Sequence, residues 1–142
     1  MAIRQFQGEY RWLSNFWPVQ VVYDMSAYPS VEHAYQAAKT LIAEERSRLF
    51  NVSAGQAKRI ARTFTIRPDW VFIKRKVMLN LVRQKFGHPQ LAEKLSATGK
   101  TPLYEGNTWG DLYWGIDLKT GEGTNHLGKI LMKVRQEING ED

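Results

Sequence analysis

The sequence predicts a single compact domain, 1–142, that is mostly helical and has short strands near its N-terminus. Two observations predict this architecture. Apolar residues recur at helical spacing through much of the chain after residue 30, whereas β-prone runs are short and lie within 3–23. With 142 residues and 43% apolar composition, the chain is long enough for one sizeable core, and it contains no repeat, low-complexity tract or domain linker.

The first segment, 3–23, has the pattern of short strands and turns rather than helix. Ile3–Phe6 and Gln20–Tyr23 are β-prone runs, and we expect a strand in each. Between them lies an aromatic loop that ends at Pro18, with Asn15 at its centre. Asn15 is either a turn residue or, if buried, a side chain whose amide must be satisfied by backbone or by ligand.

A helix is predicted to follow Ser30, which is a good N-cap residue. Glu32, Gln36 and Lys39 fall within an arc of about 60° on this helix, because successive residues are turned by about 100°. The other side is small or apolar: Val31, Ala34, Ala37, Ala38 and Leu41. The polar face has two interpretations, a solvated surface or a substrate site, and spacing alone does not choose between them.

Four further helices have clear signals. Ser53–Gln56 has the pattern of a capping box and opens a helix that we expect to reach Arg62. Pro68–Asp69 opens the longest helix, which ends near Gly87. Shorter helices are expected at 90–97 and after Thr124–Asn125.

Glycine and aromatic residues gather in 104–115, where we expect an aromatic loop. Trp109-Gly110 and Trp114-Gly115 flank Asp111. A glycine after each tryptophan permits a positive φ or a close backbone approach. The loop is shaped either around a ligand or for packing on the core.

Charge and composition favour some classes of function and exclude others. The net charge of +6 favours an anionic partner, although it also serves solubility. The basic turn of Lys58, Arg59 and Arg62 has the same two interpretations, phosphate binding or a solvated face. The absence of cysteine excludes disulfides and thiolate metal sites. The N-terminus shows no secretory signal and no segment approaches the ~20 apolar residues of a membrane span, so we expect a cytoplasmic protein.

Common catalytic motifs are missing from the sequence. The three histidines lack the spacing of metal ligands, and there is no phosphate-binding G-x-x-x-x-G-K-[ST] loop, dinucleotide turn or serine-nucleophile elbow. The remaining carboxylate, amine, amides and aromatic rings suit cleavage of a ribosyl C–N bond. That reaction has an oxocarbenium-like transition state, which a carboxylate stabilises and a proton donor assists.

Five segments, from Phe6 to Arg135, resemble in order the signatures of the NADAR family. They are F-x-G-E-Y-R-W-L-S-N-F-W-P, Y-P-S-V-E-H-A-Y-Q-A-A-K, D-W-x-x-x-K-x-x-V-M, G-N-T-W-G-D-x-Y-W-G and G-x-N-x-L-G-x-x-L-M-x-x-R. The family includes N-glycosidases acting on riboflavin-biosynthesis intermediates and enzymes that remove ADP-ribose from guanine bases. One departure is Ala61-Arg62, where the family pattern has Gly-Arg.

The resemblance implies a mainly helical α+β domain with no metal and no cofactor. It makes Glu32 the leading catalytic carboxylate and Lys39 a second catalytic candidate, as a proton donor or a Schiff-base amine. The implied substrate-binding residues are Asn15, Phe16, His33, Gln36, Trp109, Gly110, Asp111, Trp114 and Asn125.

The implied activity is that of a metal-independent N-glycosidase. Its substrate is a phosphorylated nucleotide-like molecule: a riboflavin-biosynthesis intermediate, or ADP-ribosylated guanine in a nucleoside or nucleic acid. Two alternatives remain open, a non-catalytic sensor of ADP-ribose or NAD derivatives and a nucleic-acid-binding module. The sequence predicts no membrane partner and gives no oligomeric state.

Overall fold

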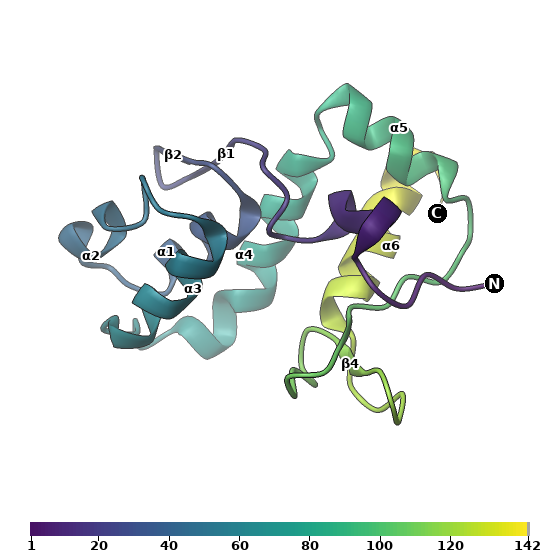
Figure 1. Ribbon diagram of the computed structural model, residues 1–142. Coiled ribbons are helices and arrows are strands. Elements are labelled where there is room, and N and C mark those ends of the chain that lie inside the picture. The colour runs from purple at the N-terminus through teal and green to yellow at the C-terminus, as the bar shows by residue number, and fades with distance from the viewer. Residues whose placement is uncertain (142) are drawn as a thin grey trace. The chain divides into compact units, whose positions relative to one another are not determined.

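The computed structural model describes residues 1–141, which form two compact units (Figure 1). One unit is Asn15–Lys85, and the other joins Met1–Ser14 to the chain from Phe86 onward. Helices dominate both units and the strands are only two or three residues long. The predicted fold class, α+β and predominantly helical, is therefore confirmed, while the single domain 1–142 stays a prediction.

The Asn15–Lys85 unit begins with a small hairpin. Strands β1 (Val21–Tyr23) and β2 (Ser26–Tyr28) pair in antiparallel register. Asp24 and Met25 have φ of 49° and 67°, and two positive φ values in a two-residue loop match the twist of a hairpin. The strand expected at Gln20–Tyr23 is thus confirmed, whereas its partner strand was not predicted.

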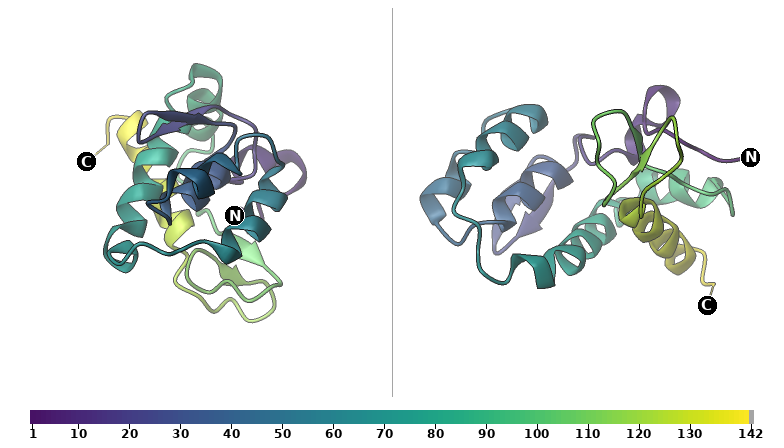
Figure 2. Two further views of the ribbon diagram at one scale, coloured as in Figure 1. Left: turned by 90° about the vertical axis from the view of Figure 1, so that its left-hand side faces the viewer. Right: turned by 90° about the horizontal axis from the view of Figure 1, so that it is seen from below.

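Helix α1 (Val31–Ala38) lies against α3, α4 and the hairpin (Figure 2). The Ser30 side chain accepts a hydrogen bond from the His33 backbone N–H, as expected of an N-cap. All eight helix residues are buried, so the solvated interpretation is wrong for Glu32 and Gln36, while Lys39, just after the helix, is half-buried. The expectation for Leu41 is also wrong: α1 ends at Ala38, and the Leu41 side chain is 62% exposed.

The remaining elements of this unit are α2 (Ala43–Ser47), α3 (Ala54–Ile60), the 3-10 turn η2 (Ala61–Thr63) and α4 (Trp70–Lys85). Both hydrogen bonds of the capping box at the start of α3 are present. The helix expected to reach Arg62 therefore ends as α-helix at Ile60 and finishes in the 3-10 turn. One stripe of α4 is buried: Trp70, Val77, Met78, Leu81, Val82 and Lys85.

The second unit holds η1 (Gly8–Leu13), α5 (Pro89–Ala97), β3 (Gly106–Asn107), β4 (Ile116–Asp117) and α6 (His126–Ile138). Helices α5 and α6 pack side by side (Figure 1). Strands β3 and β4 pair in parallel register.

The strand expected at Ile3–Phe6 is wrong. Ile3 makes only an isolated parallel bridge to Leu103. The segment expected to lack helix contains the 3-10 helix η1, because the Tyr10 and Ser14 N–H groups bond to carbonyls three residues back. Across residues 1–141, the helices fall short of the length and apolar character that a membrane span requires.

Candidate active site

The predicted catalytic carboxylate lies inside the Asn15–Lys85 unit. Glu32 is 8% exposed, and its Oε2 accepts a hydrogen bond of 2.6 Å from Gln36 Nε2, one turn along α1. Its Oε1 makes no hydrogen bond within residues 1–141, yet it is not fully enclosed. One oxygen is therefore held in place, while the other is not engaged by a hydrogen bond of the described residues.

Gln36 has an orphaned acceptor beside this carboxylate. Gln36 is 4% exposed, and its Oε1 is the enclosed side-chain polar atom that lacks a hydrogen-bond partner among the described residues. An enclosed acceptor without a donor costs free energy, on the order of 1–3 kcal/mol. Gln36 thus uses its Nε2 to hold Glu32 and leaves its enclosed Oε1 without a donor among the described residues.

Burial controls the protonation of Glu32. Desolvation raises the pKa of Glu32 above 4.5, while the Gln36 hydrogen bond and the charges of Lys58, Lys39 and His33 act in the opposite direction. A raised pKa brings the carboxyl group closer to neutral pH, where it can exchange a proton during a reaction.

Lys39 follows α1 directly, as its C-cap residue. Burial lowers the pKa of the Lys39 amine, and the charges of Lys58 and Lys74 lower it further, whereas Glu32 raises it. The Lys39 Nζ also lies 5.3 Å from the centre of the Tyr35 ring. A lysine with a lowered pKa has a larger neutral fraction, and the neutral amine is the nucleophilic form.

The His33 side chain makes hydrogen bonds near the N-terminus of α1. Its Nε2 lies 2.7 Å from the Val52 carbonyl oxygen and its Nδ1 lies 2.7 Å from Ser30 Oγ. Because a carbonyl only accepts, Nε2 carries a proton, and the Ser30 hydroxyl is the hydrogen-bond partner of Nδ1. Both ring nitrogens are therefore used by the fold, and substrate binding by His33 stays a prediction.

Asn15 and Phe16 come from the aromatic loop before the hairpin. The Asn15 carbonyl oxygen accepts a hydrogen bond from the Glu32 N–H, and its side-chain Nδ2 lies 3.5 Å from Met78 Sδ. Asn15 thus anchors the first turn of α1 through its backbone. Phe16 is 45% exposed.

The second group of predicted residues lies in the other unit, in the loop between β3 and β4. Asp111 Oδ1 accepts hydrogen bonds from the backbone N–H groups of Tyr113 and Trp114. Asn107, which is 1% exposed, donates to the Glu105 and Asp111 carbonyls and accepts from the Asp111 N–H. These side chains shape the loop by replacing backbone partners.

The two Trp-Gly pairs use glycine for different reasons. Gly110 has a φ of 85°, which residues with a side chain rarely adopt, and an added Cβ there would meet open space. At Gly115, an added Cβ would overlap the Glu105 carbonyl oxygen. Both expectations for these glycines are confirmed. Trp109 is 59% exposed, while Trp114 packs edge-on against Tyr113 with ring centres 4.8 Å apart.

Asn125 precedes α6 in the left-handed region, at φ 57°. Its side chain accepts from the Glu105 N–H at 3.0 Å and donates to the Leu103 carbonyl at 2.9 Å, and it does not cap the helix. The Asn125 amide thus joins the start of α6 to the chain before β3. Its predicted contact with substrate stays a prediction.

Sequence reasoning missed the influence of two lysines. Lys58 on α3 lowers the pKa of Glu32 more than Lys39 does, and Lys74 on α4 acts on Lys39. Lys58 was interpreted as either a phosphate ligand or part of a solvated face. A search for cations within one helical face could not find this pair, because α1, α3 and α4 bring the charges together.

The predicted site residues divide between the two units. Asn15, Phe16, Glu32, His33, Gln36 and Lys39 belong to one, and Trp109, Gly110, Asp111, Trp114 and Asn125 belong to the other. That the two sets share one pocket stays a prediction. The expectation that the enzyme needs no metal also stays a prediction. Within residues 1–141, no group of three His, Asp or Glu side chains lies close enough together to bind a metal ion.

Comparison with known proteins gives one family. A family model described as "NADAR domain" matches residues 3–139. The chain is 37% identical over 136 residues to "N-glycosidase YbiA" of Escherichia coli, a match that covers 92% of this chain and 82% of that protein. It is 35% identical over 136 residues to an N-glycosidase of Nostoc punctiforme, covering 91% and 86%.

A longer relative and a solved structure agree with this result. A riboflavin biosynthesis protein of Vibrio vulnificus is 39% identical over 130 residues, and the match covers 89% of this chain but only 35% of that protein. The NMR structure of E. coli YbiA has a TM-score of 0.84 and 31% sequence identity, over 98% of this chain and 84% of that one.

Proposed function

The chain belongs to the NADAR family, and on that premise we propose that it hydrolyses a ribosyl C–N bond in a phosphorylated, nucleotide-like substrate. The enzyme class is confirmed, since curated relatives that match nearly the whole chain are named N-glycosidases, hydrolases of N-glycosyl bonds. The substrate and the roles of individual residues are the proposal.

One observation carries the assignment of Glu32. Its carboxyl group is buried, Gln36 holds one oxygen, and the other oxygen has no hydrogen-bond partner among residues 1–141. Lys58 and Lys39 act on its pKa, yet no cation makes a direct ion pair with it within those residues, so its burial is costly for stability and a structural role explains it poorly. A role in stabilising positive charge at the anomeric carbon, or in taking a proton from attacking water, explains both its burial and its open oxygen.

Lys39 has two chemical roles that fit its position. As an ammonium it donates a proton to the departing nitrogen while water adds to C1. As a neutral amine it attacks C1 of the ring-opened sugar. The C1–N bond to the base then breaks, the base leaves with a proton, and water hydrolyses the resulting imine to restore the amine. Both routes consume one water and release one free base and one sugar.

The substrate class follows from the relatives and from charge. The name of the Vibrio vulnificus relative places that protein in riboflavin biosynthesis. A phosphorylated ribosyl-pyrimidine intermediate of flavin synthesis is therefore our first candidate, and ADP-ribosylated guanine is the second. The chain's net charge of +6 suits either anionic substrate. We place the activity in the cytoplasm without a membrane partner, in keeping with the absence of cysteine.

A release assay tests the proposal directly. The wild-type protein is incubated with a phosphorylated ribosyl-pyrimidine and, in parallel, with ADP-ribosylated guanosine, and the free base is quantified by chromatography. We expect release from one of the two. Binding of either molecule without release would replace the proposal with the sensor alternative. Affinity for oligonucleotides that falls steeply with salt, without base release, would favour the nucleic-acid-binding alternative.

A further inference from the structure

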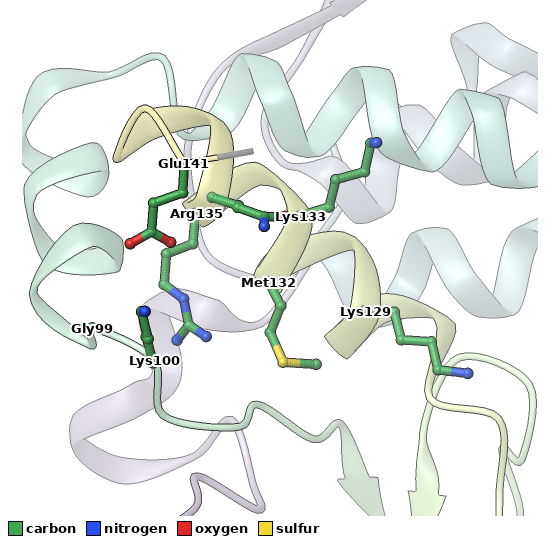
Figure 3. Close-up of a pocket in the computed structure, with 8 residues that line it drawn as sticks. Gly99, Lys100, Lys129, Met132, Lys133, Arg135 and Glu141 are labelled. Carbon is green, nitrogen blue, oxygen red and sulfur yellow. The ribbon is translucent and has the colours of Figure 1, made fainter.

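A groove of about 630 Å³ lies on the unit that contains α5 and α6 (Figure 3). It runs along α6 and is closed on one side by the turn after α5, where Lys100 lies. Four basic side chains and a single acidic one line it: Lys100, Lys129, Lys133, Arg135 and Glu141. None of these residues belongs to the candidate active site.

Arg135 is the buried member of this set. It is 6% exposed, and its Nη1 donates to Thr98 Oγ1 at 2.9 Å and to the Thr101 carbonyl oxygen at 2.7 Å. Both acceptors are neutral, and within residues 1–141 no carboxylate lies in ion-pair contact with the guanidinium. Burial lowers the pKa of Arg135, the charge of Glu141 raises it, and the group remains charged. The fold thus holds a buried cation whose hydrogen bonds go to neutral acceptors and whose acidic neighbour, Glu141, makes no direct ion pair with it, so an anion bound at the guanidinium would offset the cost of its burial.

The unused edge of the guanidinium has the geometry for an oxyanion. Nη1 makes both hydrogen bonds, so Nε and Nη2 make none within the described residues. Neither atom is fully enclosed. Among residues 1–141, the fully enclosed side-chain polar atom without a hydrogen-bond partner is Gln36 Oε1, which belongs to the other unit. Nε–H and one Nη2–H point the same way and form the side-on fork that binds carboxylate or phosphate with two parallel hydrogen bonds.

We infer that this groove binds a phosphate group, with the Nε–Nη2 edge of Arg135 as its fork and Lys100 as the second cation. Arg135 and Lys100 lie toward the same end of the groove, and Lys129 projects at the other end (Figure 3). Glu141 lines the same groove and opposes an anion, so the site is a weak, exchangeable one. The inference goes beyond the proposed function, because it uses none of the residues assigned to bond cleavage.

Titration of the full chain with inorganic phosphate, followed by backbone amide NMR, tests the site. We expect saturable shifts confined to the amides of 98–101 and 132–141. Shifts that never saturate, or that spread over both units without a focus at these amides, would overturn the inference.

Three variants sharpen the measurement. Lys100→Glu reverses one lining charge and is expected to weaken phosphate binding about tenfold or more. Glu141→Gln removes the opposing carboxylate and is expected to tighten binding severalfold. Lys119→Glu makes the same charge reversal at an exposed lysine of this unit that does not line the groove, and binding should stay within about twofold. Equal weakening by Lys100→Glu and Lys119→Glu would reduce the effect to net charge and refute a defined site.

Arg135→Lys is informative only when the chain folds, since Arg135 also holds Thr98 and Thr101. A folded variant with at least tenfold weaker phosphate binding supports the fork, and unchanged binding refutes it. Because Lys100 and Glu141 are exposed and make no such bonds, their variants decide the matter if Arg135→Lys does not fold.

Parallel titrations identify the source of the phosphate. ADP and a single-stranded oligonucleotide are compared with inorganic phosphate under the same salt conditions. Tighter oligonucleotide binding with a steep salt dependence would assign the groove to a nucleic-acid backbone, while equal binding of ADP and phosphate would assign it to a free phosphate ligand. Absence of groove shifts with all three probes overturns the inference.

Discussion

Replacing Glu32 with Gln tests the candidate active site most directly. The substitution keeps the side-chain volume, and the new amide oxygen can still accept the hydrogen bond from Gln36 Nε2. It removes the negative charge and the capacity to exchange a proton. Positioned proton transfer contributes typically about 10²–10⁴-fold to a rate, so we expect base release to fall by that factor, equivalent to about 2.7–5.4 kcal/mol of transition-state stabilisation.

Substrate affinity should change much less than turnover. A hydrogen bond to a charged group is stronger than a neutral one by about 1 kcal/mol, which corresponds to about fivefold in affinity. Turnover is measured as released base under single-turnover conditions, and affinity by calorimetry with the inactive variant.

Glu45→Gln is the matched control, because Glu45 is a second buried carboxylate of the same unit. It accepts hydrogen bonds from Thr40 Oγ1 and the Thr65 N–H, which tie α2 to the chain after α3. These hydrogen bonds, the Thr40 bond first, hold the pKa of Glu45 below its usual value. Glu45→Gln should lower the melting temperature and leave turnover within about twofold. Turnover by Glu32→Gln within threefold of wild type, on a substrate that the wild type cleaves, would refute the role of Glu32.

The remaining predictions concern Lys39, pH and the aromatic loop. Borohydride added during turnover should trap a sugar adduct, detected by mass spectrometry, on the wild type and not on Lys39→Ala; no adduct on either protein would argue for proton donation by Lys39. Because burial raises the pKa of Glu32, its contribution to stability is full below about pH 4.5 and is lost as pH rises through the folded pKa. Chemical denaturation should therefore show Glu32→Gln gaining stability over wild type with rising pH above 4.5, and a constant difference would contradict the raised pKa. Gly115→Ala places a Cβ against the Glu105 carbonyl and should cost about 1–3 kcal/mol or more, whereas Gly110→Ala meets only its positive φ and should cost about 1–2 kcal/mol; equal losses would contradict the close approach at Gly115.

Local signals in the sequence predicted the helices well. Ser30 and Ser53 are correct N-caps, and the longest helix begins where Pro68-Asp69 predicted. A cap depends on a side chain and a backbone N–H two or three residues away, so the chain within one turn is sufficient to specify it. The strand expected at Ile3–Phe6 failed because a strand also needs a partner. Ile3 finds one only at Leu103, 100 residues along the chain.

In the candidate site, too, local sequence signals predicted some features, and others depended on contacts between distant parts of the chain. Spacing placed Glu32, Gln36 and Lys39 on one face of a helix, and the family motifs named them as functional. Spacing could not show that this face is buried, nor that Lys58 and Lys74 from neighbouring helices act on the titration of Glu32 and Lys39.

By itself, the sequence determined the family, the helix boundaries set by caps, and the residue types available for glycosidic chemistry, because each of these depends on short stretches of chain. Only the tertiary structure decided which of those groups lose their water. The burial of Glu32, the orphaned oxygen of Gln36 and the burial of the Arg135 guanidinium arise where elements far apart in the sequence exclude solvent. The free energy of a charged or polar group depends on that environment more than on its neighbours in sequence.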